Sequence, residues 1–463
     1  MPHRMTPLDA AFLDAEDEDR HASMAIASVA ILDGPVPTHE EVVEAILGKL
    51  PRVPRYRQKL RTVPFDLGRP VWVDDASFDI RYHVRRTALP APGGDEALCR
   101  LVARLMSQRL DRDRPLWECW VVEGLADGRW AVLSKVHHCM SDGVAGTNLY
   151  NALYDHTAEP AVGEPDGWTP EAEPSTLRLT AEALRELVLS PAEQVRLISQ
   201  AMRNPGLAVR RAVDITRGLV ELARAMVVPA TESSLTGPIG QARRYAVGRA
   251  ALPDVMRVAR HHHVSMNDVV LAAIAGAFRS LLIARGEEPD AHVIRTLVPV
   301  SVRRPGEHGV HDNRISLMLP FLPVDIADPL LRLKTVHEHM ATLKESKEAE
   351  AGEAMTALAI REPFPPISWG IRLASHLPQR SIITVTTNVP GPRAPLYLLG
   401  RPIVEILPYV PIAVRLRTGV CILTYCDRVA FGVTFDYGSA PEAEMLAHGI
   451  EEGVAELVAT VDR

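Results

Sequence analysis

The sequence lacks apolar stretches long enough to cross a membrane. Its longest apolar runs, such as Met24–Leu32 and Val269–Phe278, fall far short of the roughly 20 residues that span a bilayer as a helix. The N-terminus turns acidic over Asp14–Asp19, where a secretory signal would place its apolar core. We therefore expect a protein that is not exported and that contacts membranes only peripherally.

Cysteines are few, and there is no excess of positive charge. The five cysteines are odd in number and scattered without a CxxC spacing, which favours a reduced cytosolic chain over a disulfide framework. The net charge of -7, with a pI near 6.2, excludes the basic footprint of a nucleic-acid-binding protein. We expect a cytoplasmic protein for which nucleic acid is not a partner.

The length and the placement of proline indicate two domains. At 463 residues, with 47% hydrophobic and 24% charged residues, the chain is globular and too long for one ordinary core. Residues 159–174 hold four prolines among five acidic residues, which predicts a solvated linker. We predict an α+β fold with an N-terminal domain over residues 1–160, a linker and helical connector over 161–240, and a C-terminal domain over 241–463.

Local patterns predict helices and strands in both halves. Thr38 and Glu41 have the spacing of a capping box that opens a helix, and Asp95–Leu110 has helical periodicity. Trp117–Leu125 and Trp130–Val136 are apolar, β-branched and aromatic, and the short polar segment between them predicts a hairpin. In the second half we expect a helix at Asn267–Arg285, a last helix near Pro441, and strands at Ile294–Val302, Ile315–Leu322, Ile382–Asn388 and Val420–Phe435.

A histidine pair carries the candidate chemistry. His137 and His138 follow a predicted strand, and Asp142 and Gly143 close the loop before a predicted helix. Neighbouring side chains of an extended segment point to opposite faces, so only one histidine of the pair can face a given cavity. A neutral imidazole, which titrates at about 6.5, can take a proton from a hydroxyl group and return it to a leaving group. Two other interpretations stay open at this point: a packed histidine, and an Asp142 that only caps the helix.

The sequence gives little support for a metal or for a covalent intermediate. The run His261–His263 is a loose metal candidate, which we interpret as the polar end of a helix. No second cluster of His, Glu or Cys has ligand spacing. A GxSxG nucleophile motif is absent, so nothing local indicates a covalent acyl-enzyme. We expect neither a metal nor a cofactor.

Several motifs, taken in order, resemble those of one enzyme family. HHxxxDG, here His137–Gly143, is the signature of the superfamily of chloramphenicol acetyltransferase, plant acyl-CoA-dependent acyltransferases and peptide-synthetase condensation domains. The other motifs are Pro7–Asp9, Phe12–Leu13, Arg114–Glu118, Asn267–Ala272, Val298–Arg303, Asn313–Ser316 and Asn388–Pro392. This set resembles the bacterial wax ester synthase/diacylglycerol acyltransferase family over nearly the whole chain, and within it the actinobacterial triacylglycerol synthases. The DFGWG motif of the plant enzymes is absent, so their details do not carry over.

The resemblance implies two chloramphenicol-acetyltransferase-like domains joined by a helical connector, with the active-site channel at their interface. Long-chain acyl-CoA is then the acyl donor, a substrate and not a cofactor. His138 is expected to deprotonate the acceptor hydroxyl, which attacks the thioester directly, while His137 packs beside it or orients it. Asp142 and Gly143 are expected to be structural, with Asp142 paired to Arg303.

The resemblance also gives candidate substrate-binding residues, each with a simpler alternative. They are Pro115, Leu116, Trp117, Asn267, Asn388 and Gly391. The first three shape the acceptor side or form an ordinary core strand. The first asparagine opens a helix that has a capping signature. The last two residues belong to a strand-to-turn segment, which is either only a turn or supplies a donor near the reacting carbonyl.

The favoured function is acylation of diacylglycerol by long-chain acyl-CoA, which makes storage triacylglycerol. Wax ester synthesis on a long-chain alcohol is the nearest alternative, and sequence does not separate the two because acceptor choice depends on channel shape. A non-catalytic lipid-binding protein is the alternative from another class. Such a protein would need no intact histidine motif, so the intact motif counts against it.

A basic segment gives one candidate for membrane contact. Arg178–Arg224 has eight arginines, no lysine and five acids among apolar residues. Such a stretch either lies on an anionic membrane surface or is a solvated helix packed on its own domain. Because the acceptor dissolves in membranes, we expect peripheral association with the inner face of the plasma membrane or with lipid droplets.

Overall fold

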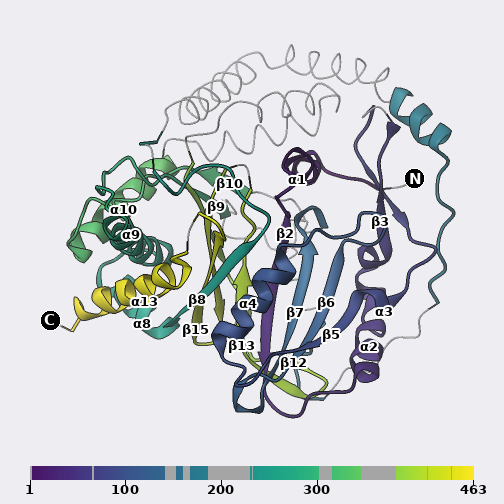
Figure 1. Cartoon of the computed structure of the whole chain (residues 1–463), viewed down its shortest axis with the longest axis horizontal. Coiled ribbons are helices and arrows are strands. Elements are labelled where there is room, and N and C mark those ends of the chain that lie inside the picture. The colour runs from purple at the N-terminus through teal and green to yellow at the C-terminus, as the bar shows by residue number, and fades with distance from the viewer. Residues whose placement is uncertain are drawn as a thin grey trace, which may run out of the picture.

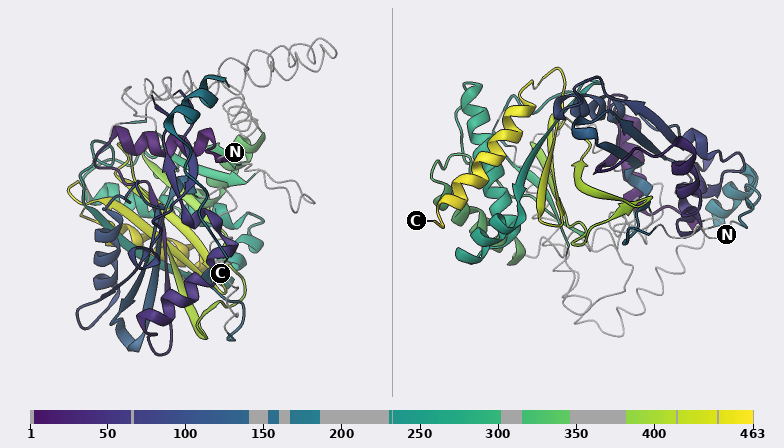
Figure 2. Two further views of the ribbon diagram at one scale, coloured as in Figure 1. Left: turned by 90° about the vertical axis from the view of Figure 1, so that its right-hand side faces the viewer. Right: turned by 90° about the horizontal axis from the view of Figure 1, so that it is seen from below.

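The computed structural model describes residues 3–64, 67–140, 153–159, 167–185, 230–231, 233–301, 315–345, 382–413, 415–439 and 441–462. These residues form two six-stranded mixed sheets that lie side by side, and a small three-stranded sheet (Figure 1). Helices cover the outer side of the second sheet, as the view from below shows (Figure 2). The predicted α+β class with two mixed units is confirmed.

The first sheet is built mainly from the first 140 residues. Its strand order is β12-β13-β2-β7-β6-β5, and β6 and β7 form the predicted antiparallel hairpin. The small sheet has the order β1-β4-β3, and the predicted capping box opens α2. The bounds are β1 His3–Arg4, α1 Pro7–Glu18, β2 Ala25–Leu32, α2 His39–Leu47, β3 Gln58–Arg61, β4 Val71–Asp74, α3 Ile80–His83, β5 Val84–Ala88, α4 Asp95–Met106, β6 Trp117–Glu123 and β7 Trp130–His137.

The second sheet has the order β10-β9-β11-β14-β15-β8. Every strand predicted in this half is present, and the segment near residues 420–435 is a hairpin of β14 and β15. The bounds are β8 Arg243–Ala251, α8 Leu252–His261, α9 Met266–Ala284, β9 Thr296–Ser301, β10 Ile315–Met318, α10 Pro329–Glu345, β11 Thr384–Val389, β12 Tyr397–Leu398, β13 Arg401–Tyr409, β14 Thr418–Tyr425, β15 Arg428–Asp436 and α13 Ala443–Ala459.

Helix α9 is the centre of the second core. The Ser265 side chain accepts the N–H of Asp268 and the Asp268 carboxylate accepts the N–H of Ser265, which closes the predicted capping box. An apolar stripe of the helix, which includes Val270 and Phe278, is fully buried, and the helix lies in one apolar cluster with residues of α8, α10 and α13. Within the described residues, α9 is long and apolar enough to cross a membrane, but most of it is buried as in a core helix.

Two strands from the second half complete the first sheet. After β11 the chain crosses over, and β12 and β13 add to the free side of β2. Tyr245 on β8 donates its hydroxyl to Pro408 O of β13 at 2.7 Å. A Cβ on Gly432 of β15 would lie 1.8 Å from the same carbonyl oxygen, so only glycine allows this approach. The predicted domain boundaries at residues 160 and 241 stay predictions. The crossover of β12 and β13 to the first sheet was not predicted from the sequence.

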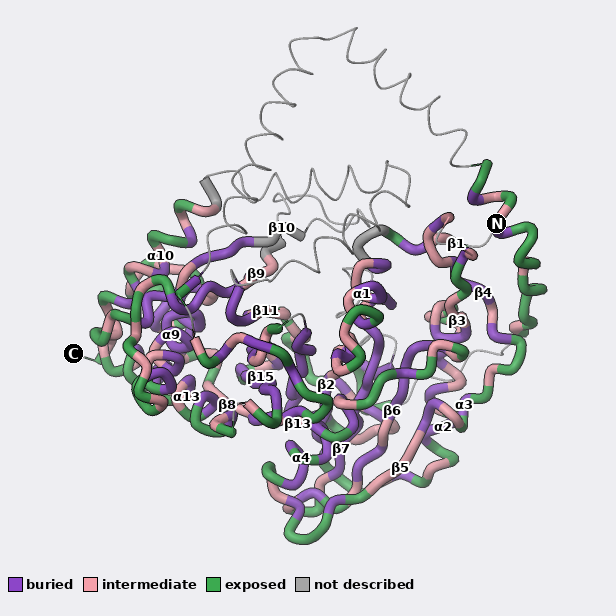
Figure 3. The backbone as a smooth tube through the Cα atoms, turned by 45° about the horizontal axis from the view of Figure 1, so that its top comes forward, coloured by how far each residue is buried: buried purple, intermediate pink, exposed green. Residues whose placement is uncertain are grey.

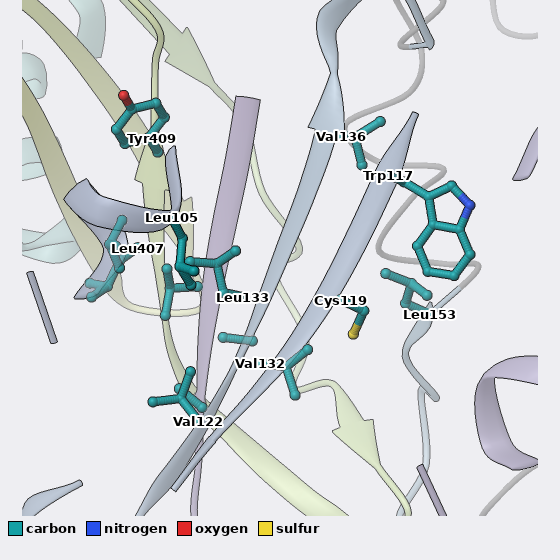
Figure 4. Packing of buried hydrophobic residues seen from close by; sticks show 14 of the residues in the cluster. Leu105, Trp117, Cys119, Val122, Val132, Leu133, Val136, Leu153, Leu407 and Tyr409 are labelled. Carbon is teal, nitrogen blue, oxygen red and sulfur yellow. The ribbon is translucent and has the colours of Figure 1, made fainter. Parts of the chain in front are cut away.

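The two faces of the first sheet have different coverings. Trp117, Cys119 and Leu153 lie on one side of the strands, and Leu105 and Leu407 lie on the other (Figure 4). Figure 3 shows that buried residues follow these strands, while exposed residues gather at the periphery. Helix α4 lies over the second face and contacts β8, so it stands between the two halves.

A buried lysine ties β7 to α4. Lys135, on β7, is 1% exposed and its Nζ donates to Leu105 O (2.9 Å) and Gln108 O (2.6 Å) at the end of that helix. Burial lowers the pKa of Lys135 to about 8, because desolvation disfavours the charged form. The carbonyls at a helix C-terminus favour a cation, so the contact holds the strand against the helix.

Candidate active site

The histidine pair lies where β7 ends. His137 is the last residue of the strand, and a 3-10 turn spans His138–Met140. The His137 N–H donates to Leu116 O (2.9 Å) and the His138 N–H donates to Met24 O (2.9 Å). The N–H groups of the two histidines are therefore bound by residues that precede β6 and β2. These two hydrogen bonds fix the point where the chain leaves the sheet.

The imidazole of His138 is half-buried and stacked. The ring of Phe12, on α1, lies 3.8 Å away between centroids, with the two planes inclined by 24°. Burial lowers the pKa of His138 from 6.5 to about 4, because desolvation disfavours the imidazolium. His138 is therefore neutral at physiological pH, which is the state that a general base needs.

The imidazole of His137 is enclosed, with 1% of the residue exposed. Its Nδ1 accepts the N–H of Cys139 at 3.2 Å. The hydrogen-bond network thus assigns the proton of the neutral ring to Nε2. That nitrogen faces Glu16 Oε2 at 3.6 Å. Protein surrounds this ring, which supports the orienting role expected for His137.

Glu16, on helix α1, connects that helix to the histidine pair. Its Oε1 accepts the Met24 N–H at 3.0 Å, and its Oε2 accepts from Arg112 Nη2 at 2.8 Å. Burial alone would raise the pKa of this carboxyl, but His137, Arg112 and the Met24 N–H outweigh burial and lower it to about 2. Sequence reasoning missed Glu16, which sits in an acidic stretch. Its spacing of four residues from Phe12, on one helix face, was the available signal.

The segment Pro115, Leu116 and Trp117 lies beside the histidine pair and is fully buried. The indole N–H of Trp117 donates to Tyr56 O at 2.8 Å, and the His83 ring stacks on the indole with centroids 4.5 Å apart. Protein atoms therefore surround these side chains. The geometry favours the core-strand alternative, and contact with a substrate stays a prediction.

Asn267, Asn388 and Gly391 form a second cluster, in the second half. Asn388 Nδ2 lies 3.5 Å from Asn267 Oδ1, which joins the end of β11 to the start of α9. The Gly391 N–H donates to Thr424 Oγ1 at 3.1 Å, and a Cβ on Gly391 would lie 1.9 Å from Thr424 O. Only glycine fits that approach, which supports the turn alternative for Gly391. The roles of the three residues toward a substrate stay predictions.

The remaining site candidates have different outcomes. Asp142, Gly143 and Arg303 lie outside the described residues, so the expected Asp142–Arg303 pair stays a prediction. His261 ends α8 and His262 is its C-cap, as the interpretation of a polar helix end predicted. In the described part of the chain, no group of three or more His, Cys, Asp or Glu side chains could hold a metal ion.

An open groove of about 550 Å³ lies between α4 and β8, where the two halves meet. Its wall includes the charged side chains of Arg100, Arg104, Arg243, Arg244 and Glu96. Charged side chains are costly to bury against an acyl chain, so we do not identify this groove with the acyl channel. The channel at the interface stays a prediction.

Comparison with solved structures identifies the fold. A wax ester synthase/diacylglycerol acyltransferase from Marinobacter aquaeolei VT8 superposes with a TM-score of 0.67 at 24% identity, covering 100% of both chains. The starter condensation domain of rhizomide synthetase superposes with a TM-score of 0.59 at 14% identity, covering 100% of this chain and 95% of that one. The protein thus has the two-domain fold that acyltransferases and condensation domains share.

Sequence comparison narrows this class to one family. Residues 5–270 match the wax ester synthase/diacylglycerol acyltransferase catalytic domain, and residues 311–458 match the C-terminal domain of the same family. A probable diacylglycerol O-acyltransferase of Mycobacterium tuberculosis, tgs1, is 44% identical over 461 residues, which cover 100% of this chain and 97% of the relative. A putative diacylglycerol O-acyltransferase of that species is 34% identical over 460 residues, covering 99% and 92%. The chain belongs to this family and is an O-acyltransferase.

Proposed function

We propose that this protein transfers a long-chain acyl group from acyl-CoA to the free hydroxyl of diacylglycerol, with His138 as the general base. One observation carries the proposal: the neutral, half-buried imidazole of His138 at the end of β7, stacked against Phe12. The relatives that are 44% identical to this chain are named as putative or probable diacylglycerol O-acyltransferases. These names favour diacylglycerol over a long-chain alcohol as the acceptor.

The reaction moves one proton twice. His138 accepts the proton of the acceptor hydroxyl while the hydroxyl oxygen attacks the thioester carbonyl carbon, and a tetrahedral oxyanion forms. The oxyanion collapses, the carbon–sulfur bond breaks, and the imidazolium protonates the leaving CoA thiolate. The products are an ester and free CoA, without a covalent acyl-enzyme and without a cofactor.

The low pKa of His138 shapes this mechanism. A base with a pKa of about 4 is weaker than one tuned to neutral pH, so the imidazolium must be stabilised where it forms. The oxyanion supplies the opposite charge beside the ring, an interaction that the free enzyme lacks. Burial of the reacting groups also keeps water away from the thioester.

An acceptor assay tests this function. Purified protein is supplied with labelled palmitoyl-CoA and either diacylglycerol or hexadecanol, and the products are separated by chromatography. We expect labelled triacylglycerol from the wild-type protein and none from the His138→Ala variant. Labelled wax ester alone would make a long-chain alcohol the acceptor. No labelled ester with either acceptor would favour a non-catalytic lipid-binding protein.

We further propose that helix 176–185, the described start of the connector, binds lipid surfaces. One side of the helix is anchored, because Leu179 is fully buried in a cluster with residues of β4. The other side carries Leu177 and Leu184, which are 81% and 45% exposed. Residues seven apart share a helix face, so the two leucines form one outward apolar face, held in place by the buried side.

Charge supports an anionic lipid surface as the partner. Arg178 and Arg185 are exposed on the same helix, and basic residues beside an outward apolar face are typical of interfacial helices. Arg178 also pairs with Glu182 at 2.9 Å, but such exposed pairs contribute little stability. Association with the inner face of the plasma membrane or with lipid droplets would bring the enzyme to its acceptor.

A further inference from the structure

Helix α1 presents two side chains, one turn apart, to the histidine pair. Phe12 stacks on His138, and Glu16, four residues later, faces His137. Residues four apart lie on one face of a helix. A single rigid element therefore contacts both imidazoles.

The groups around the Glu16 carboxylate are donors. They are the Met24 N–H at 3.0 Å, Arg112 Nη2 at 2.8 Å and the protonated Nε2 of His137 at 3.6 Å. The last separation is too long for a hydrogen bond, so the contact is electrostatic in this structure. A neutral amide at this position would set its NH2 group against at least one donor.

The tautomer of His137 matters for the turn that carries His138. In the observed arrangement Nδ1 of His137 accepts the N–H of Cys139, inside the 3-10 turn. The other tautomer would place a proton on Nδ1, directly against that N–H, and the turn would lose the bond. A carboxylate opposite Nε2 favours the tautomer that keeps it.

We infer that Glu16 is a positioning residue for acyl transfer: its carboxylate holds His137 in one tautomer and so fixes the turn that carries His138. Met24 strengthens this link, because it donates its N–H to Glu16 and accepts the N–H of His138. The inference rests on the proposed role of His138 as the base. It assigns no contact between Glu16 and a substrate.

Isosteric and conservative substitutions test the inference. Glu16→Gln keeps the size and removes the charge, and we expect kcat to fall roughly 10- to 100-fold because a small misplacement of a catalytic group has effects of this order. The KM for acyl-CoA should change less than about two-fold, because no substrate contact is lost. Glu16→Asp, which keeps the charge, should restore part of kcat.

Asp17→Asn is the matched control. Asp17 contacts the same Arg112, at 2.8 Å, but is 56% exposed and one residue along the helix, so this variant removes the charge from an arginine contact without touching His137. We expect wild-type kcat. If Glu16→Gln lowers the unfolding temperature while the folded protein keeps wild-type kcat, Glu16 only anchors α1 and the inference is overturned.

A double variant tests whether the effect passes through His137. In a His137→Ala background, Glu16→Gln should lower kcat by a smaller factor than in the wild type. An equal factor in both backgrounds would show that Glu16 acts by another route. His138→Ala separates the two proposals: full activity of that variant defeats the proposed mechanism, whereas its inactivity beside a fully active Glu16→Gln defeats only the positioning role.

Discussion

The ring of Phe12 lies parallel to that of His138 to within 24°, with the centroids 3.8 Å apart. Phe12 belongs to the first helix and His138 to the turn after β7, so the contact joins segments that are far apart in sequence. A carbon ring over one face of the imidazole excludes water there, which adds to the burial that lowers the pKa of His138. The ring nitrogens, at the edge, remain the atoms that exchange protons.

Removing the Phe12 ring should loosen His138. Aromatic pairs contribute about 0.5–1.5 kcal/mol beyond burial, so we expect Phe12→Leu to lower kcat by roughly 2- to 10-fold. Phe12→Tyr keeps the ring and should stay close to wild type. Steady-state kinetics with acyl-CoA and diacylglycerol measure both variants. Equal activity of the leucine and tyrosine variants would mean that the stacking does not orient His138.

The two histidines should respond differently to truncation. His138→Ala removes the base, and loss of a general base typically costs on the order of 10² to 10⁴ in rate. His137→Ala should cost less, because His137 only orients its neighbour. Circular dichroism should show that both variants are folded. An inactive His137 variant beside an active His138 variant would reverse the assignment.

The elements that sequence predicted are those with a strong local pattern. The hairpin of β6 and β7 follows from two β-branched, aromatic runs separated by a short polar turn. Helix α9 follows from its capping box and its apolar periodicity. In both, the type of element is specified by residues a few positions apart, so the local sequence contains the signal.

Two features depend on contacts that no local pattern records. Arg401–Tyr409 is an ordinary apolar segment until it pairs with β2, more than half the chain away. Glu16 lies in an acidic run that looks solvent-exposed, and only its tertiary contacts with Met24, Arg112 and His137 bury it. The motifs that make up the site could therefore be predicted from the sequence. The contacts of Glu16 on α1 that hold the histidine pair in place could not.

The pH dependence of activity should lack a step near neutrality. An unperturbed histidine base would lose half its activity at about pH 6.5, but the pKa of His138 is about 4. We therefore expect kcat/KM to be flat between about pH 5.5 and 7.5 and to fall only as the pH approaches 4. A midpoint of activity near pH 6.5 would show that His138 is not the base or is not buried in solution.

Stability should fall in acid for two concordant reasons. The pKa of His138 is about 4 in the folded protein and 6.5 in an unperturbed histidine. The neutral ring's contribution to folding stability is therefore complete above pH 6.5 and is lost as the pH falls toward 4. The pKa of Glu16 is lowered from 4.5 to about 2. The contribution of its carboxylate to folding stability is therefore lost as the pH falls from about 4.5 to 2. Kinetic measurements below pH 5 therefore need a parallel measurement of the folded fraction.

The expected pair of Asp142 and Arg303 can be tested although both residues lie outside the described part of the chain. Asp142→Ala and Arg303→Ala should each lower activity and the melting temperature. Contacting residues show interaction energies of about 0.5–3 kcal/mol in double-mutant cycles, so the double variant should be less impaired than the sum. Strict additivity in thermal unfolding would exclude the pair.

The outward leucines of helix 176–185 should anchor the enzyme to lipid. Fully burying a leucine side chain contributes about 1.5–3 kcal/mol, so replacing Leu177 and Leu184 with serine should weaken binding to anionic vesicles at least about ten-fold. Added salt should weaken wild-type binding only in part, because salt screens the arginines but not the leucine contact. Flotation or sedimentation of vesicles measures both effects.

The matched control replaces Ile283 and Leu331, each 53% exposed on helices of the second half, with serine. This variant loses comparable exposed apolar surface away from helix 176–185, so it should bind vesicles like the wild type. Activity of the leucine variant on a short, water-dispersed diacylglycerol should persist, because the histidine pair lies on another element. Equal vesicle binding by both serine variants would mean that these leucines do not make the lipid contact. Loss of activity on the dispersed acceptor would instead show that helix 176–185 supports the catalytic site.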